Sequence, residues 1–278
     1  MDRLTKFSIL VVSLNSGEKL PETIKSILSQ TYTDYEVVVK DGGSKDDSLT
    51  SLESYLKTCP AYADKVRIVS RKDTGIYEGM NQATKEARGE YYYFLNCGDL
   101  FADNEVLMNL SKNMDTAIKQ GSTAKIFYGD IFDNLREQTV PSNPNIDAFG
   151  CYRNVPCHQA CIYHYSLFEE RGYEPKYRVR ADYEHFLWCY FRKDAKPQYL
   201  NVVIASYEGG GFSETKENRI RSKKEHKEIT EKYMTKGQLL RYKTALALTL
   251  APLRTKMAES PKFAGFYNKC KGLIYGKK

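Results

Sequence analysis

The N-terminal part of the chain alternates continuous apolar runs with segments that have a single apolar face. Residues 7–14 form an apolar run that ends in a polar turn, which is typical of a buried strand. The next segment, 21–30, carries Ile24, Ile27 and Leu28 at the spacing of one helical face. This alternation of strand and helix predicts a mostly parallel sheet with helices on both faces. The expected strands are 7–14, 35–40, 66–70 and 91–95, and the expected helices are 21–30, 46–57 and 76–87.

The alternation is looser in the second half of the chain, where longer polar segments separate the apolar runs. Because the last part contains no strand-like run, we expect an α/β domain over residues 1–215 and a helical C-terminal extension over 216–278. Within the domain, further strands are expected over 125–131, 160–165 and 198–207, and a further helix over 182–192.

Basic residues are concentrated in the C-terminal extension. The whole chain has a net charge of +7, but residues 216–278 carry 17 Lys and Arg against 5 Asp and Glu, a net charge of +12. A basic segment favours an acidic partner, either anionic lipid headgroups or nucleic acid. Next to apolar residues it is typical of a helix that lies on a membrane. The alternative is a solvated helix that packs on the domain. The leucines of the apolar side are Leu239, Leu240, Leu246, Leu250 and Leu253.

The composition favours a cytoplasmic protein. Hydrophobic residues make up 41% of the chain and charged residues 28%, which is ordinary for a soluble globular protein. The seven cysteines are odd in number, and free thiols suit a reducing compartment. No signal peptide is evident, and the apolar run at 245–253 is too short to span a bilayer. We expect a cytoplasmic location, with peripheral contact to the inner face of the membrane through the extension.

Polar clusters follow successive strands of the predicted sheet. Asn15 follows the first strand, residues 41–46 the second, Asp73 the third, and residues 96–99 the fourth. The carboxyl ends of parallel strands meet at one edge of the sheet, where ligands bind. Asp99 is the only carboxylate in the last turn and suits a divalent cation with a phosphorylated ligand. The alternative is that Asp99 merely begins the following helix.

Taken together, these segments resemble the family-2 inverting glycosyltransferases of the GT-A fold, and among them the bacterial enzymes of polysaccharide biosynthesis. The resemblance extends over roughly residues 7–213, and each segment alone is weak evidence. The segments that carry it are 7–15, 26–32, 36–44, 73–81, 87–90 and 96–99.

The resemblance implies a nucleotide-sugar site in the half formed by residues 1–120 and an acceptor site in the half formed by 121–215. Asp99 would be the metal ligand of the family's DxD element, with Mn²⁺ or Mg²⁺ as cofactor. The element usually holds two or three acids, so a single acid predicts weaker metal affinity. The donor-binding residues that the resemblance implies are Asn15, Asp41, Asp73, Asn81, Asn96 and Gly98.

An inverting transfer also needs a base that removes the proton of the acceptor hydroxyl. The family places this carboxylate at the start of a helix after the acceptor loops, and Asp182 matches that position. The alternative is that Asp182 only caps the helix and that Glu184 or His185 is the base. His158 and Gln159 match an acceptor-side segment, although His158 could equally be a packed histidine.

The expected activity is therefore the transfer of one sugar, most often from a UDP-sugar, to a lipid-linked saccharide acceptor. The products expected from the resemblance are exopolysaccharide, O-antigen or capsule. The Gln-x-x-Arg-Trp signature of processive synthases is absent, and Gly209–Ser213 sits where the family closes a loop over the diphosphate. We expect no nucleic-acid partner. A degenerate subunit that binds a nucleotide sugar without catalysis is the alternative, and the missing N-terminal phosphate loop argues against a sugar-phosphate nucleotidyltransferase.

Overall fold

The computed structural model of the chain describes residues 4–62, 64–209 and 215–248. Every strand expected from the apolar runs is present within a few residues of its expected bounds. The strands are β1 (Thr5–Ser13), β2 (Tyr35–Asp41), β3 (Val66–Ser70), β4 (Gly89–Phe94), β5 (Leu100–Phe101), β6 (Ile126–Asp133), β7 (Gln138–Val140), β8 (Cys161–His164) and β9 (Pro197–Tyr207).

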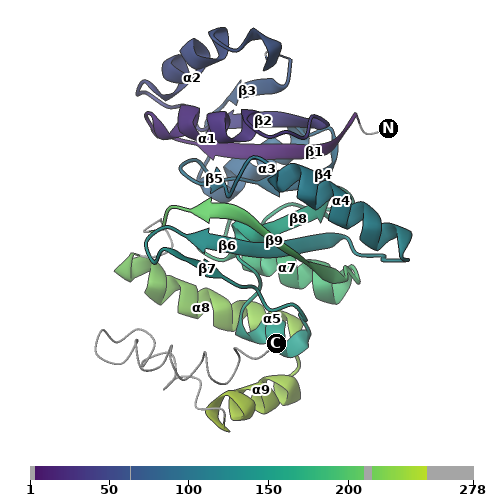
Figure 1. Ribbon diagram of the computed structural model, residues 1–278. Coiled ribbons are helices and arrows are strands. Elements are labelled where there is room, and N and C mark those ends of the chain that lie inside the picture. Colours follow the sequence, from purple (N-terminus) through teal and green to yellow (C-terminus); the bar gives the residue numbers. More distant parts are fainter. Residues whose placement is uncertain (1–3, 63, 210–214, 249–278) are drawn as a thin grey trace. The chain divides into compact units, whose positions relative to one another are not determined.

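These strands form one sheet in the order β3-β2-β1-β4-β8-β6-β9-β5, and β7 pairs with β6 beside this path (Figure 1). β1 pairs in parallel with β2 and β4, β2 with β3, and β6 with β9. β5, β7 and β8 run antiparallel to their neighbours. Most strands therefore point in one direction, which confirms the predicted α/β sheet.

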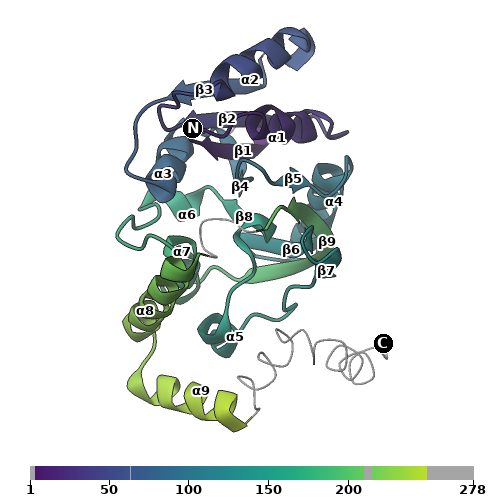
Figure 2. The same cartoon turned by 90° about the vertical axis from the view of Figure 1, so that its left-hand side faces the viewer.

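Helices cover both faces of the sheet, as the alternation of elements predicts. α1 (Lys19–Leu28), α2 (Ser48–Lys57) and α4 (Val106–Lys119) lie on one face (Figure 2). α3 (Ile76–Glu86), α6 (Ser166–Glu169) and α7 (Ala181–Arg192) lie on the other. The remaining helices are α5 (Ala148–Arg153), α8 (Lys216–Tyr233), α9 (Lys236–Leu248) and the short 3-10 helices η1 (Pro60–Tyr62) and η2 (His158–Ala160).

The hydrophobic core follows from the two-residue period of the strands. Phe7, Ile9 and Val11 of β1 are fully buried and belong to one cluster with Ile24 of α1 and Leu107 of α4. Because side chains alternate along a strand, the residues between them face the opposite side of the sheet, where α3 packs against β1. Both faces of β1 and β2 are covered, so the centres of these strands are mostly apolar and buried.

The sequence analysis missed the short elements that close the second half of the sheet. β5 has two residues and pairs with β9, and β7 has three residues and pairs with β6. The suggestion that Asp99 begins a helix is wrong, because β5 follows it directly and α4 begins only at Val106. Two-residue pairings leave no periodic signal, so only tertiary contacts define them.

The chain divides into two compact units, residues 1–226 and 227–278. α8 begins in the first unit and ends in the second. Helices are present from Lys216 to Leu248, as expected for the extension, while Leu250 and Leu253 of the predicted apolar stripe lie outside the described residues. In the described part of the chain, no helix has the length and apolarity that crossing a membrane requires.

Candidate active site

Two adjoining cavities of the first unit lie at the carboxyl ends of the parallel strands. The smaller one, about 390 Å³, is lined by the end of β1, by Asp73 and by the start of α3. The larger one, about 460 Å³, is lined by the turn after β4, by η2, by the start of α7 and by the end of β9. Ile76, Tyr77 and Arg178 line both cavities. The cavities therefore form one continuous site for a ligand with two parts.

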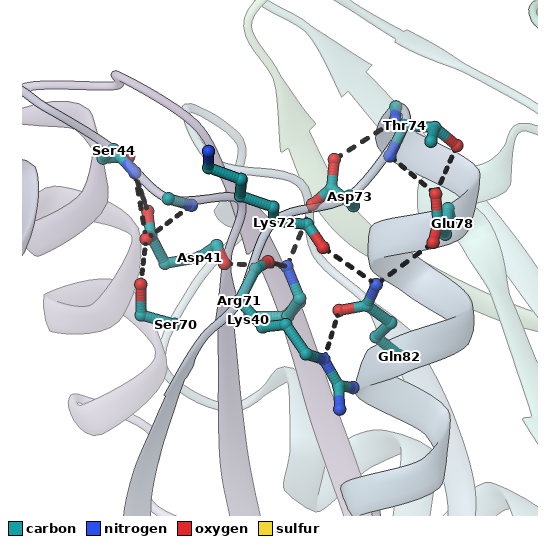
Figure 3. A network of polar contacts seen from close by, with 12 residues as sticks. Lys40, Asp41, Ser44, Ser70, Arg71, Lys72, Asp73, Thr74, Glu78 and Gln82 are labelled. Atoms are coloured by element: carbon teal, nitrogen blue, oxygen red, sulfur yellow. Dashed lines mark hydrogen bonds and ion pairs between the residues drawn. The ribbon is translucent and has the colours of Figure 1, made fainter.

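Asp73 in the smaller cavity is held by a buried lysine that the sequence analysis overlooked. The Lys40 ammonium group is completely buried and donates to Asp73 Oδ2 at 2.9 Å (Figure 3). It also donates to the backbone carbonyls of Asp41 and Arg71, at 2.7 and 2.6 Å. Gly75 N donates to Asp73 Oδ1 at 3.1 Å. Asp73 is therefore fixed from two sides, and a lysine directly after the apolar run 37–39 was the available signal for Lys40.

Asp41 is buried at the end of β2 and organises the loop that follows. It accepts hydrogen bonds from the backbone of Gly43 and Ser44 and from the hydroxyls of Ser44 and Ser70 (Figure 3). Burial acts to raise the pKa of Asp41, but the hydrogen bonds from Ser44 and Ser70 outweigh it and hold the pKa below its usual range. Its oxygens are engaged within the protein, so it shapes the loop at the nucleotide edge.

Two further residues of the expected donor site, Asn15 and Asn81, line neither cavity. Their side chains form hydrogen bonds that join neighbouring segments. Asn15 has a positive φ of 49°, and its Oδ1 accepts from Lys45 N at 2.9 Å, which joins the end of β1 to the loop after β2. Asn81 of α3 donates to Tyr173 O at 2.8 Å and accepts from Tyr173 N at 2.7 Å. This pair of bonds ties α3 to the segment that leads to α7.

Asp99 is a buried carboxylate whose orientation is set by its neighbours. Gln159 Nε2 donates to Asp99 Oδ2 at 2.7 Å, and Glu208 N donates to Asp99 Oδ1 at 3.0 Å. Burial raises the pKa of Asp99, and these hydrogen bonds oppose the shift. Asn96, Asp99 and Gln159 all line the larger cavity. Gln159, expected on the acceptor side, also positions the expected metal ligand.

Gly98 explains why the turn before Asp99 has its shape. Its φ is +101°, and a Cβ atom at this position would lie 2.7 Å from Glu208 Oε2. Any other residue would therefore meet backbone strain and would displace the Glu208 carboxylate. Glu208 was not identified from the sequence. Its carboxylate lies 2.6 and 2.8 Å from Lys19 Nζ, so the end of β9, the turn after β4 and the start of α1 meet at this point.

A divalent cation would have two carboxylates available here, those of Asp99 and Glu208, which line the same cavity. Within the described residues, no group of three or more His, Cys, Asp and Glu side chains could hold a metal ion. Magnesium-type sites that bind nucleotides often use one or two carboxylates together with phosphate oxygens. The residues present therefore fit a cation that binds together with a diphosphate ligand.

Asp182, the expected base, lies in the first turn of α7 and lines the larger cavity. Tyr77 OH donates to Asp182 Oδ1 at 2.8 Å, and the same hydroxyl lies 3.0 Å from the carbonyl oxygen of Val179. Burial, together with the Asp182 carboxylate, raises the pKa of Tyr77 far above its usual value, so this hydroxyl keeps its proton. Asp182 thus has one defined orientation.

The two alternative bases are turned away from the cavity. Glu184 is fully buried and pairs with Arg171 at 3.0 Å. His185 is also fully buried, and its ring stacks on Phe168 with a centroid distance of 4.4 Å. Burial lowers the pKa of His185 to about 3. Neither residue lines the larger cavity, so Asp182 has the better position for a group that acts on a ligand.

His158 lines the larger cavity and is at the same time packed among aromatic rings. Its ring centroid lies 5.2 Å from that of Phe94 and 5.9 Å from that of Tyr173. Within the described part of the chain, neither ring nitrogen has a hydrogen-bond partner. Burial lowers the pKa of His158 although the Asp182 charge opposes this, so the ring is neutral beside the expected base.

The segment just before α7 is clamped by the first turns of α8, within the first unit. Backbone N–H groups of Arg178, Val179 and Arg180 donate to the Glu225 carboxylate at 3.0, 3.1 and 2.9 Å. Arg180 Nε also donates to Ser222 Oγ at 2.7 Å. Successive N–H groups around one carboxylate form an anion nest, and this one fixes the backbone that leads to Asp182. Of the predicted closing loop, Gly209 is described and residues 210–214 lie outside the described residues.

The mixed α/β fold, with its central sheet covered by helices on both faces, is that of the GT-A class of glycosyltransferases. Residues 8–193 match the sequence profile described as Glycosyl transferase family 2. The chain belongs to this family and is a glycosyltransferase.

A relative in sequence supports the family assignment. The PGL/p-HBAD biosynthesis glycosyltransferase of Mycobacterium tuberculosis is 31% identical over 211 residues, which cover 75% of this chain and 79% of the relative. Both proteins therefore share the greater part of their length.

Solved structures with low sequence identity share the fold. TarS residues 1–349 of S. aureus superpose with a TM-score of 0.59 at 19% identity, over 73% of this chain and 60% of TarS 1–349. TarS has also been crystallised with UDP-GlcNAc. The mannosyltransferase PcManGT of Pyrobaculum calidifontis, in complex with GDP-Man and Mn²⁺, has a TM-score of 0.61 at 15% identity, over 99% of this chain and 88% of PcManGT.

Proposed function

We propose that the protein transfers a single sugar, with inversion, from a nucleoside-diphosphate donor to a hydroxyl of a saccharide acceptor. The observation that supports this most directly is that Asp99 and Asp182 line one cavity, which adjoins the smaller cavity containing Asp73. One carboxylate is then available at the leaving group and another at the acceptor. A simple nucleotide-binding subunit would not need Asp182 oriented by Tyr77.

In this proposal the nucleoside occupies the smaller cavity, and the diphosphate and sugar extend into the larger one. Asp73, held by Lys40, contacts the nucleoside, while the loop shaped by Asp41 borders it. Asp99 and Glu208 would hold Mn²⁺ or Mg²⁺, which neutralises charge on the leaving diphosphate when bound. Asn96 and Gly98 belong to the turn that presents Asp99.

Asp182 acts as the general base. Its carboxylate takes the proton of the acceptor hydroxyl as that oxygen attacks the anomeric carbon from the face opposite the diphosphate. The bond from the anomeric carbon to the diphosphate oxygen breaks, and the nucleoside diphosphate leaves with the bonding electrons. His158, neutral and apolar in its contacts, forms part of the wall against which the acceptor lies.

The proposed donor, acceptor and location are supported by the comparisons and by the charge of the extension. UDP-sugars are the first choice, and the UDP-GlcNAc and GDP-Man complexes of TarS and PcManGT make both bases worth testing. The basic extension, +12 over 216–278, supports a lipid-linked acceptor and reversible contact with the cytoplasmic face of an anionic membrane. Cell-surface polysaccharide, such as exopolysaccharide, O-antigen or capsule, is the proposed product, without any role for nucleic acid.

The decisive experiment is a thermal-shift screen of nucleoside-diphosphate sugars with and without Mn²⁺, followed by turnover of each sugar that stabilises the protein. NMR of the product reports whether the anomeric configuration is inverted. Binding without sugar transfer or donor hydrolysis would favour the non-catalytic subunit. Co-sedimentation with anionic and neutral liposomes at low and high salt tests the extension, and equal recovery in all supernatants would remove the membrane from the proposal.

A further inference from the structure

Arg178 has a distinctive place at the junction of the two cavities. Of the three residues that line both cavities, Ile76 is apolar and Tyr77 is engaged with Asp182, so Arg178 is the only cation. Its side chain is exposed to solvent. A ligand that extends from one cavity to the other must pass this guanidinium group.

Three other cations around the two cavities already have partners. Lys40 pairs with Asp73, Lys19 with Glu208, and Arg180 with Ser222, its guanidinium also lying 5.3 Å from the centroid of the Tyr183 ring. Among the residues that the structure describes, the Arg178 guanidinium makes no hydrogen bond or ion pair. A positive charge at the junction is therefore available to a ligand.

The backbone of Arg178 is fixed although its side chain is unpartnered. Its N–H donates to Glu225 at 3.0 Å, in the carboxylate clamp that also holds Val179 and Arg180. Glu225 is 7% exposed, so this clamp is shielded from solvent. A fixed Cα atom restricts where the guanidinium can reach, which lowers the entropy lost when it binds.

The chemistry of the junction suits a diphosphate. A guanidinium group offers paired N–H donors whose geometry matches two phosphate oxygens. The turn after β4 supplies one acid, Asp99, so a cation held there is less strongly bound than in a site with several acids. A positively charged side chain beside the diphosphate would compensate for this weaker binding of the cation.

We propose that Arg178 binds the diphosphate of the donor at the junction of the two cavities, alongside the cation at Asp99. The inference rests on the proposed function, because it assumes that the donor is a nucleoside diphosphate sugar. Arg178 then supplies a metal-independent part of donor affinity. It also places the diphosphate between the nucleoside cavity and the cavity that contains Asp182.

The test compares UDP with uridine, which lacks the phosphates, by calorimetry and by displacement, with GDP and guanosine as the second pair. Measurements with EDTA isolate the contribution that needs no metal. Arg178→Gln should weaken binding of the diphosphate roughly ten-fold or more, as expected for a lost charged hydrogen bond, and leave nucleoside binding unchanged. Arg178→Lys should fall in between, since it keeps the charge and loses the paired donors.

Lys176→Gln is the matched control, because it removes a cation two positions away that lines neither cavity and is 57% exposed. It should bind UDP like the wild type. Unchanged UDP affinity in Arg178→Gln, or an equal loss of uridine and UDP affinity, would overturn the assignment of Arg178 alone. If the wild-type protein binds neither UDP nor GDP, with or without Mn²⁺, the proposed donor fails and the assignment fails with it. Melting temperatures of all variants confirm that they are folded.

Discussion

Tyr77 and Asp182 are 105 positions apart in the sequence, and the tyrosine hydroxyl donates a 2.8 Å hydrogen bond to the carboxylate. Tyr77 lies in the first turn of α3, next to the smaller cavity, whereas Asp182 lies in the first turn of α7. The bond therefore connects α3, which borders the cavity proposed for the nucleoside, to the proposed base. We infer that Tyr77 of α3 orients the carboxylate of Asp182.

Replacing Tyr77 by Phe removes the donor while keeping the ring. We expect kcat to fall roughly ten-fold, as for loss of a hydrogen bond to a charged group, while KM for the donor changes little. Steady-state kinetics separates the two effects. Tyr35→Phe, which removes another buried tyrosine hydroxyl, bonded to Ile27 O far from the cavities, serves as the control. A change in donor KM alone would contradict a positioning role.

The base itself is tested by Asp182→Asn, which keeps the size and polarity but cannot accept the proton. Turnover should drop by roughly 10² or more, while donor affinity measured by calorimetry stays near the wild-type value. Glu184→Gln is the comparison, and it should affect stability through the ion pair with Arg171 more than it affects chemistry. A wild-type rate in Asp182→Asn would show that the base has been assigned to the wrong residue.

Asp99→Ala should remove most of the Mn²⁺-dependent part of donor binding, because the site has only one other carboxylate, that of Glu208. Calorimetry with UDP in the presence of Mn²⁺ and of EDTA measures this part directly. Asp103→Asn removes an acid shortly after the same turn that lines neither cavity, and should leave binding unchanged. The metal-ligand role is wrong if Asp99→Ala binds UDP and Mn²⁺ as the wild type does.

Lys40→Met tests the buried ion pair. The substitution leaves Asp73 and two backbone carbonyls without their shared donor, and breaking a buried pair in this way costs roughly 3–5 kcal/mol of unfolding free energy. Urea denaturation monitored by fluorescence or circular dichroism gives the value. Lys45→Met, at an exposed position on the next loop, should stay within about 0.5 kcal/mol of the wild type.

The lowered pKa of Asp41 predicts that the unfolding free energy depends on pH. Its pKa is lower in the folded state than in the unfolded chain, so the charged form stabilises the fold at neutral pH. This contribution is present above the usual aspartate pKa of about 4 and is lost as the pH falls towards the lower folded value. Asp41→Asn should cost roughly 1–3 kcal/mol at pH 7 and progressively less below pH about 4. A difference that does not change with pH would contradict the assigned shift.

Local patterns in the sequence determined the α/β architecture and the edge at which the site lies. The strands are apolar because both faces of the sheet are covered, and the helices show their buried face at a 3.6-residue period. Polar residues after each strand then indicate the ligand edge without any knowledge of contacts. Asp99 was identified in this way, whereas Asp182 came from the family resemblance alone, and both line one cavity of the structure.

Only the tertiary structure decided which of these polar residues face a ligand and which support others. Asp41 and Asn81 follow the same strand-end and motif logic as Asp73, and the oxygens of all three accept hydrogen bonds within the protein. Only Asp73 lines a cavity. Whether a carboxylate meets a ligand or a backbone N–H group depends on the path of segments far away in the sequence. No local pattern records that path.

The residues that hold the site residues in place are also far from them in the sequence. Glu208 meets Asp99 across 109 positions, and Glu225 meets Val179 across 46. β5 exists only because its two residues pair with β9. Such contacts form because burial of the core brings the strand ends together, and this long-range packing leaves no periodic trace in the residues that it joins. The sequence by itself therefore determined the layers and the ligand edge of this glycosyltransferase, and the folded chain decided how its side chains are paired there.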